Sequence, residues 1–532
     1  MAAAVAVGLA LALTSGMTEA RHRSKTAPGP IATATRSAGV VSVTTAIPPT
    51  TKATATPTAL ATAPRPANVN IASLPALPAG WPTTLQLGMA DSPGGAAAMK
   101  TTANFGFRYQ YLSGGANTGT GWATWNANGA FATNYIQDSV SHSITPVLTY
   151  YQIRQTAPGN AQYEPDGVYN NLQNTATMTS YYNDLKLFFQ KAGAFPNNAV
   201  VLHMEPDLWG YMQQHSTNDD ASTVTTKVAA TGLSDLAGLP DTAAGFAKAV
   251  KKLRDTYAPN VVLAYHISVW GTNFSLLSGT WTNAQVDALG VRSANFYTSL
   301  QTNFDIAFVD QTDRDAGYKQ VVNGDPNGWY DATDYANTLR YYTAFVGVAQ
   351  KRLVVWQIPF GNTKMRAMNN TTNHYQDNHV EWLLDDVGGT HLSDYINSGV
   401  VAFLFGGGAT GTTCACDAAG DGITNPAAIN GNNLTSLTAD DDGGFFRHKA
   451  AAYYAAGPLA LSGGVVPTPT PIGTATPTPT RTPTSTPTPT RTPTSTPTPT
   501  RTATPTTTPT RTPTPNIGIP GGETVIPLTP TP

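Results

Sequence analysis

The chain has almost no cysteine and unusually little charge. Its 532 residues include two cysteines, and Lys, Arg, Asp and Glu make up 12% of the sequence, about half of the ~25% that is usual in soluble domains. So few cysteines exclude a disulfide-rich framework. The formal net charge of −2 gives no electrostatic basis for binding nucleic acid or an anionic membrane. Polarity comes instead from Thr, Asn, Ser, Gln and Tyr, which suits a neutral partner such as carbohydrate, although secretion and a biased genome explain the same composition.

The sequence also lacks the short motifs of several large enzyme classes. It contains no Walker A loop, no G-x-S-x-G elbow and no H-E-x-x-H zinc motif. Cys414 and Cys416 form a C-x-C pair without a second ligand pair at zinc spacing, so we expect a local disulfide if the protein is exported, or else two thiols. Asp417 and Asp421 could ligate Ca²⁺, but an Asp-Gly turn is the simpler interpretation. We therefore expect neither a metal nor a cofactor.

Both ends of the chain differ in composition from its middle. The apolar run Ala2 to Leu13 is too short to cross a bilayer comfortably and predicts a signal peptide over residues 1–20, with a signal anchor as the alternative. Residues 21–77 are predicted to be a disordered Ala/Thr/Pro linker, and residues 466–532 a disordered Thr/Pro stalk with a ten-residue repeat. No other segment is expected to span a membrane. The protein should therefore be a secreted monomer, either free or held at the cell envelope by its stalk.

The middle of the chain, residues 78–465, alternates apolar runs with helical patterns, which is typical of βα units. Helical patterns include 242–257, with an apolar stripe at Phe246, Val250 and Leu253, and a final helix is expected over 443–457. The predicted strands are 84–90, 105–112, 144–153, 199–205, 260–270, 304–310, 352–360 and 400–408. Eight such strands predict a (β/α)8 barrel. A doubly wound sheet is the main alternative, but Gly94-Gly95 does not match its phosphate-binding motif.

Carboxylates and aromatic residues gather where these strands end, and barrel active sites lie at the carboxyl ends of strands. Glu205, after the fourth strand, is the predicted general acid, although it could instead begin a helix. Asp310 and Asp91 are the candidates for the second carboxylate. Rings that stack on sugars and polar groups that bind hydroxyls complete such a site. The predicted substrate-binding residues are Asp207, Trp209, Arg108, Tyr150, His266, Trp270, Gln357 and Trp122.

Structural roles explain some of these residues equally well. Asp207 could simply cap the helix that follows it, and a strand histidine such as His266 is more often a packing residue. The tryptophans could belong to the core that covers the barrel. Asp310 faces the barrel mouth if it shares a face with Phe308.

With these residues in place, the chain resembles secreted bacterial (β/α)8 glycoside hydrolases, over roughly residues 78–465. In the retaining barrel glycosidases, the acid Glu follows strand four and the nucleophile Glu ends strand seven. Glu205 matches the first position, and the resemblance implies that it is the acid. Gln357 stands at the second position, and Met204 replaces the Asn that precedes the acid in those enzymes. These departures leave the partner of Glu205 to come from another strand.

The sequence therefore predicts an exported glycoside hydrolase that acts on the O-glycosidic bonds of a polysaccharide. A non-catalytic carbohydrate-binding or surface-display barrel is the alternative, favoured by Gln357 and by the stalk. An envelope-processing enzyme of another chemistry fits less well, since the sequence offers no Ser/His or metal motif for it.

Overall fold

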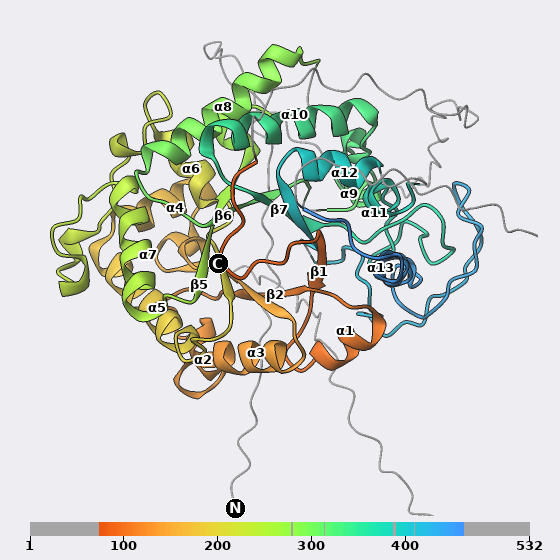
Figure 1. The fold of residues 1–532 in the computed structure, drawn as a ribbon, viewed down its shortest axis with the longest axis horizontal. Helices are drawn as coiled ribbons and strands as arrows, with labels where there is room; N and C mark the ends of the chain where they lie inside the picture. The colour runs from red at the N-terminus through yellow and green to blue at the C-terminus, as the bar shows by residue number, and fades with distance from the viewer. Residues whose placement is uncertain (1–73, 278–279, 313, 387–389, 409, 462–532) are drawn as a thin grey trace, which may run out of the picture. The chain divides into compact units, whose positions relative to one another are not determined.

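The described part of the chain is built around one closed sheet. The structure, a computed structural model, describes residues 74–277, 280–312, 314–386, 390–408 and 410–461. The predictions of a signal peptide and a C-terminal stalk, and nearly all of the predicted N-terminal linker, lie outside these residues. Eight parallel strands follow one another around the barrel in chain order, from β1 to β8 (Figure 1).

Each strand lies within one of the predicted apolar runs, so the predicted (β/α)8 barrel is confirmed. The strands are β1 Gln86–Ala90, β2 Phe107–Leu112, β3 Thr145–Tyr150, β4 Val200–Met204, β5 Val261–Ile267, β6 Ile306–Asp310, β7 Leu353–Ile358 and β8 Val400–Phe405. Most of their residues are buried on both faces, as expected when helices cover the outside of a parallel sheet and side chains fill its interior.

The helices form the outer ring seen in Figure 1. Their bounds are α1 Ala96–Thr102, α2 Trp122–Trp125, α3 Ala130–Ser141, α4 Glu164–Gln173, α5 Thr175–Ala192, α6 Leu208–His215, α7 Ala243–Tyr257, α8 Asn283–Ser299, α9 Ala316–Val322, α10 Ala332–Ala349, α11 His379–Leu384, α12 Thr390–Asn397 and α13 Phe445–Ala456. Helix α7 shows why they form where they do. The Thr242 side chain accepts a hydrogen bond from the backbone N–H of Gly245 and caps the helix, and the predicted stripe of Phe246, Val250 and Leu253 is buried.

Strand alternation decides which side chains reach the interior of the barrel. On β5, Tyr265 points outward, where its ring lies 5.0 Å from that of Trp209. The next residue, His266, therefore points inward. Phe308 of β6 is paired in register with His266 and therefore also points inward. Its ring stacks at 4.4 Å on His203 of β4. Strands β4 and β5 thus bring two histidines into the interior, near the carboxyl ends.

Strand β7 is irregular near its carboxyl end. Its pairing with β8 shifts register between Val355 and Ile358, and Gln357 has a φ of 59°. The irregularity changes the direction of the side chains at this end of the strand.

Among the described residues, no helix is both long and apolar enough to cross a membrane.

Candidate active site

Backbone strain marks the carboxyl ends of β4 and β7. Glu205, Asp207 and Gln357 have positive φ values of 47°, 72° and 59°. Such conformations are uncommon for residues other than glycine and cost about 1–3 kcal/mol each. Strain of this size concentrates at functional sites, and here it lies where barrel enzymes place their chemistry.

Asp207 is partly exposed between β4 and α6. Its side chain makes no capping hydrogen bond to α6, so the helix does not need this carboxyl as its cap. The Tyr151 hydroxyl lies 3.4 Å from Asp207 Oδ2 and 3.3 Å from Glu164 Oε1. Burial, followed by the negative charges of Glu164 and Asp310, holds the pKa of Asp207 well above its usual range.

These contacts indicate where the protons lie. A hydroxyl has one hydrogen, so Tyr151 can donate to only one of its two carboxyl neighbours. Both contacts are hydrogen bonds if Asp207 is protonated and donates to Tyr151, while Tyr151 donates to Glu164. The raised pKa of Asp207 agrees with this arrangement. Arg154, whose Nε lies 3.4 Å from Glu164 Oε2, balances the charge of Glu164. Asp207 is thus the carboxyl group of this mouth whose protonated form its surroundings favour.

Asp310 ends β6 on the interior face that it was predicted to share with Phe308. Its Oδ1 lies 3.4 Å from His266 Nε2. His266 Nδ1 lies 2.9 Å from His203 Nε2, and His203 Nδ1 lies 3.2 Å from Thr149 Oγ1. These contacts connect β6, β5, β4 and β3 in turn. Asp310 therefore has a chain of polar side chains beneath it, and its negative charge is one of the causes that raise the pKa of Asp207.

Polar and aromatic groups from β2 and β7 also reach the mouth. Gln357 Nε2 donates to the Tyr111 hydroxyl at 3.2 Å, and the Tyr111 ring lies 5.9 Å from that of Trp356. Burial lowers the pKa of Arg314, and its interactions with Tyr318 and Asp207 oppose this shift. A guanidinium group therefore lies within electrostatic reach of Asp207.

An aromatic pair lies next to Asp207. The rings of Tyr211, in α6, and Trp270, after β5, are 4.8 Å apart and both residues are partly exposed. Gly210 allows this approach, because a Cβ there would lie 2.7 Å from the Trp270 ring. Burial and the charge of Asp207 raise the pKa of Tyr211. Exposed rings beside an acid suit the apolar face of a sugar.

Glu205, the predicted acid, is placed differently. It is 0% exposed, and its Oε1 accepts the backbone N–H groups of Gln152 and Ile153, both at 3.1 Å. Burial raises the pKa of Glu205 to about 8, opposed in part by Tyr181 and by these two amides. The carboxyl holds the turn after β3 and has no surface open to a ligand. Its role as the acid stays a prediction, and its geometry is that of a positioning group.

Asp91 and Arg108 belong to a separate ion cluster. Arg108 is 0% exposed, with Nε 3.3 Å from Asp91 and Nη1 2.6 Å from Asp138, and its guanidinium lies 4.1 Å from the centre of the Tyr135 ring. Burial raises the pKa of Asp91, and Arg108 opposes this shift. Since β2 alternates, Arg108 points towards the helices while Tyr109 and Tyr111 point inward. The structure therefore does not bring either residue to Asp310.

Three of the predicted substrate-binding aromatic residues are core residues. Trp122, Tyr150 and Trp209 are each 0% exposed. Trp122 Nε1 and the Tyr150 hydroxyl both donate to Asp184 Oδ1, at 2.7 and 2.5 Å, and Trp209 Nε1 donates to the Met204 carbonyl at 2.9 Å. No ring face is left on which a sugar could stack. Trp270, Asp207, His266 and Gln357 are the predicted binding residues that the structure brings to the mouth.

Sequence analysis missed four residues of the site: Tyr111, Tyr151, Glu164 and His203. His203 and Tyr111 lie on the inner face of their strands because the register with β3 pairs both of them with Thr149, and the sequence alone does not give this register. Glu164 starts α4, well beyond the strand end, and no local signal in the sequence marks it.

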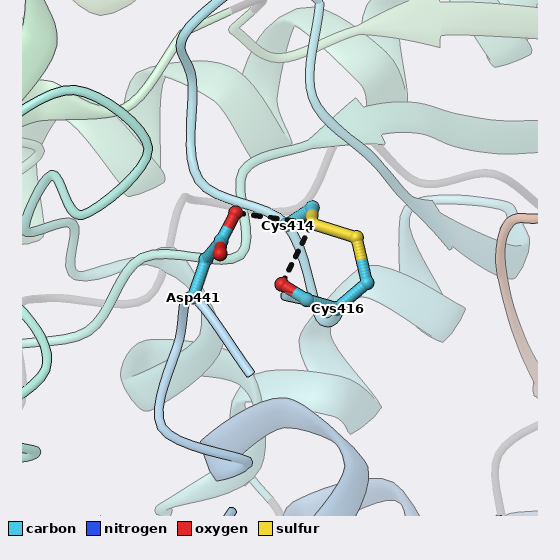
Figure 2. A group of neighbouring side chains, drawn as sticks. All are labelled: Cys414, Cys416 and Asp441. Carbon is cyan, nitrogen blue, oxygen red and sulfur yellow. Dashed lines mark hydrogen bonds between the residues drawn. A yellow bond between two sulfur atoms is a disulfide. The ribbon is translucent and has the colours of Figure 1, made fainter. Parts of the chain in front are cut away.

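One group of side chains has the spacing of a metal site. Among the described residues, Cys414, Cys416 and Asp441 are the Cys, His, Asp and Glu side chains close enough to share an ion (Figure 2). The two sulfurs form a disulfide, one of the two expected states, so no thiolate remains to bind a metal. Burial raises the pKa of Asp441 to about 8. Its Oδ2 lies 3.3 Å from Cys414 Sγ, and since this sulfur has no hydrogen, the protonated carboxyl is the donor.

The Asp417 and Asp421 loop has the geometry of a turn. Asp417 Oδ1 accepts the backbone N–H of Asp421 at 3.1 Å, and Asp421 Oδ2 lies 3.2 Å from His374 Nε2. These carboxylates already bind groups of the protein, as the simpler interpretation expected.

Comparison with known proteins adds little about activity. No family model matches the sequence, and no curated protein matches it. Similar solved structures include a GH5 xyloglucan-specific β-1,4-glucanase from a ruminal metagenomic library, with 14% identity, 70% of this chain and 89% of that chain covered, and a TM-score of 0.36. An exo-β-1,4-mannosidase from Opitutaceae bacterium strain TAV5 is 10% identical, with 72% and 62% covered and a TM-score of 0.38. A D-psicose 3-epimerase from Clostridium cellulolyticum H10 is 10% identical, with 70% and 97% covered and a TM-score of 0.29. Likeness at this level does not separate one barrel activity from another.

Proposed function

We propose that this barrel is an exported glycoside hydrolase that cleaves O-glycosidic bonds of a polysaccharide, with Asp207 as the general acid and Asp310 as the second carboxylate. One observation carries the proposal: two carboxyl groups at one barrel mouth lie in different environments. Burial and neighbouring negative charge raise the pKa of Asp207 well above its usual range, whereas Asp310 lies beside a ring nitrogen of His266. Environments that separate two carboxyl groups in this way assign the acid and its partner.

The division of labour follows from the chemistry of glycoside cleavage. Asp207 donates its proton to the oxygen of the leaving sugar. Asp310, as a carboxylate, either activates a water molecule or attacks the anomeric carbon; these two mechanisms require carboxyl separations of ~6.5–9.5 Å and ~5–5.5 Å. Arg314 supplies positive charge near Asp207, and Glu164 supplies negative charge that raises the pKa of Asp207.

The surroundings of the carboxyl groups favour a neutral sugar polymer. Tyr211 and Trp270 offer rings on which a pyranose can stack, and Gln357 offers an amide for its hydroxyls. The low content of charged residues, 12%, gives no basis for preferring a charged polymer. The apolar run Ala2 to Leu13 supports export of the protein, and polysaccharides of this kind are found outside the cell.

Hydrolysis of a panel of neutral polysaccharides, measured as the release of reducing ends, tests this function. Asp310→Asn should lower kcat by at least about 100-fold, because the variant removes the second carboxylate while keeping the shape of the side chain. Asp184→Asn is the matched control: Asp184 is a buried carboxyl of the outer layer, bonded to Trp122 and Tyr150, and its loss should leave kcat unchanged. Equal activity of the Asp310 variant and the wild type would refute the assignment.

A non-catalytic carbohydrate-binding barrel is the second candidate, and Gln357 favours it. This residue stands at the end of β7, where the retaining glycosidases that the chain resembles place a glutamate. Calorimetric titration with the same polysaccharides separates the two functions. If none of the polysaccharides that bind to the protein releases reducing ends, the carbohydrate-binding function is favoured.

A further inference from the structure

A chain of polar side chains runs under Asp310 through the interior of the barrel, joined by two hydrogen bonds and by one close contact between a histidine nitrogen and the carboxylate. Thr149, His203 and His266 are 0%, 0% and 1% exposed. Thr149 Oγ1 contacts His203 Nδ1 at 3.2 Å, His203 Nε2 contacts His266 Nδ1 at 2.9 Å, and His266 Nε2 contacts Asp310 Oδ1 at 3.4 Å. Both nitrogens of each imidazole have a polar partner. The nitrogen that carries the hydrogen on one ring therefore determines which nitrogen carries it on the next ring.

The direction of the chain can be worked out from its buried end. The Thr149 hydroxyl is buried, and in the described part of the chain its hydrogen-bond partner is His203 Nδ1. If the hydroxyl donates there, this nitrogen is bare. Burial, which is the larger effect, and the neighbouring His266 hold the pKa of His203 well below its usual range. A neutral His203 ring with a bare Nδ1 carries its single hydrogen on Nε2.

The same reasoning continues along the chain to the carboxylate. His203 Nε2–H donates to His266 Nδ1, which is therefore bare, so His266 carries its hydrogen on Nε2 and points it at Asp310. In the opposite tautomer, His266 would turn Nδ1–H against the hydrogen of His203 and face Asp310 with a bare nitrogen. An ionised carboxylate only accepts hydrogen bonds, so that arrangement would break two contacts.

We propose that His203 is a positioning residue for Asp310, which acts by fixing the tautomer of His266 so that His266 donates Nε2–H to the carboxylate. This inference rests on the proposed function only in taking Asp310 as the second carboxylate. His203 never meets the substrate. It acts from the interior of the barrel, through the ring that holds Asp310 ready.

The packing around the two rings supports a fixed geometry. His203 is stacked on Phe308 at 4.4 Å, and Trp356 lies edge-on to His203 at 4.7 Å and to His266 at 5.8 Å. These apolar rings leave the neighbouring ring and Thr149 as the polar partners of His203. Charged and titratable groups that interact with Asp310 come from other elements: Asp207 after β4, Lys319 in α9, and Tyr111, Tyr330, Tyr341 and Tyr342.

Three substitutions separate hydrogen bonding from packing. His203→Leu removes the donor to His266. His203→Gln restores it, because the glutamine amide nitrogen can occupy the place of Nε2. Phe308→Leu is the control, since Phe308 packs on His203 and its side chain has no hydrogen-bonding group. Thermal unfolding of each variant shows whether the barrel is intact.

The direct readout is ¹⁵N NMR of the full-length protein labelled at histidine. The chain has nine histidines, so single substitutions assign the signals. In the wild type and in Phe308→Leu, both His203 and His266 should carry their hydrogen on Nε2. In His203→Gln, His266 should keep this Nε2–H form. In His203→Leu, His266 should shift towards the Nδ1–H tautomer. A wild-type His266 in the Nδ1–H form, or an unchanged His266 signal in His203→Leu, would overturn the inference.

The second readout is kcat for hydrolysis. It should fall in His203→Leu, because Asp310 loses its oriented partner, return towards the wild-type value in His203→Gln and stay near that value in Phe308→Leu. An unchanged kcat in His203→Leu, or a loss that His203→Gln does not reverse, contradicts the inference. The NMR experiment needs no substrate. If the protein showed no hydrolytic activity, the proposed function would be refuted, but the NMR spectra would still test the tautomers of His203 and His266.

Discussion

Replacing Glu205 by glutamine should make the stability of the barrel less dependent on pH. The Glu205 carboxyl is 0% exposed and accepts two backbone N–H groups. Glutamine keeps an oxygen for both of these donors and cannot ionise. If Glu205 is a buried positioning group, the variant should fold normally and should lose the cost of carrying a buried charge at high pH.

The size of the effect follows from the raised pKa of Glu205. Burial moves it from its usual 4.5 to about 8, a difference of 8 − 4.5, or about 3.5 units, which is worth roughly 5 kcal/mol. Because the pKa is higher in the folded state, the stabilisation is complete below pH 4.5 and is lost as the pH rises towards 8. Between pH 5 and pH 8 the wild type should lose on the order of 3 kcal/mol relative to Glu205→Gln.

Chemical denaturation of both proteins in the same buffers measures this difference. Other titrating groups cancel in the difference between the two free energies of unfolding, since only Glu205 has changed. Asp184→Asn is the matched control: burial raises the pKa of Asp184 to about 6, so its difference should level off near pH 6 instead of pH 8. A difference for Glu205→Gln that stays flat from pH 5 to pH 8, or that changes in the opposite direction, would refute the reasoning.

Three further variants probe the binding surface and the supports of the barrel. Trp270→Ala should weaken polysaccharide binding about tenfold, measured by calorimetry, and unchanged affinity would remove the aromatic pair from the site. Arg108→Met should lower the free energy of unfolding by about 2–4 kcal/mol, because it leaves the carboxyl of Asp91 without its cation, and a smaller loss in chemical denaturation would count against the ion cluster. Cys414→Ala with Cys416→Ala should cost about 1–2 kcal/mol, since the disulfide closes a very short loop; a larger loss would show that the bridge supports more than its own turn.

The fold could be predicted because its signal is repeated eight times. Every strand is an apolar run in the sequence. To predict the barrel it is enough to detect each run, and the exact first and last residues of each strand are not needed. The first and second strands, for example, begin two residues later in the structure than in the sequence prediction, and this changes nothing in the order of the barrel.

The site was predicted less well because it depends on which face a residue occupies. Arg108 and Tyr150 lie on the outer face of their strands, one position from the inward residues Tyr109 and Tyr151, and a shift of one residue reverses the face. The turn at Glu205 could not be foreseen either. Glu205 has a positive φ there, and its buried carboxyl accepts hydrogen bonds from the backbone after β3. Asp310 and His266 were found because they end or face inward on regular strands.

The most direct test of the central claim compares Asp207→Asn with Glu205→Gln on two substrates. One is a polysaccharide, whose leaving sugar needs a proton, and the other is an aryl glycoside of the same sugar with a dinitrophenolate leaving group, which needs none. The account predicts that Asp207→Asn loses on the order of 100- to 10,000-fold in kcat on the polysaccharide and keeps most of its activity on the aryl glycoside, while Glu205→Gln stays near wild type on both. The reverse pattern, with Glu205→Gln inactive on the polysaccharide and Asp207→Asn active, would contradict it.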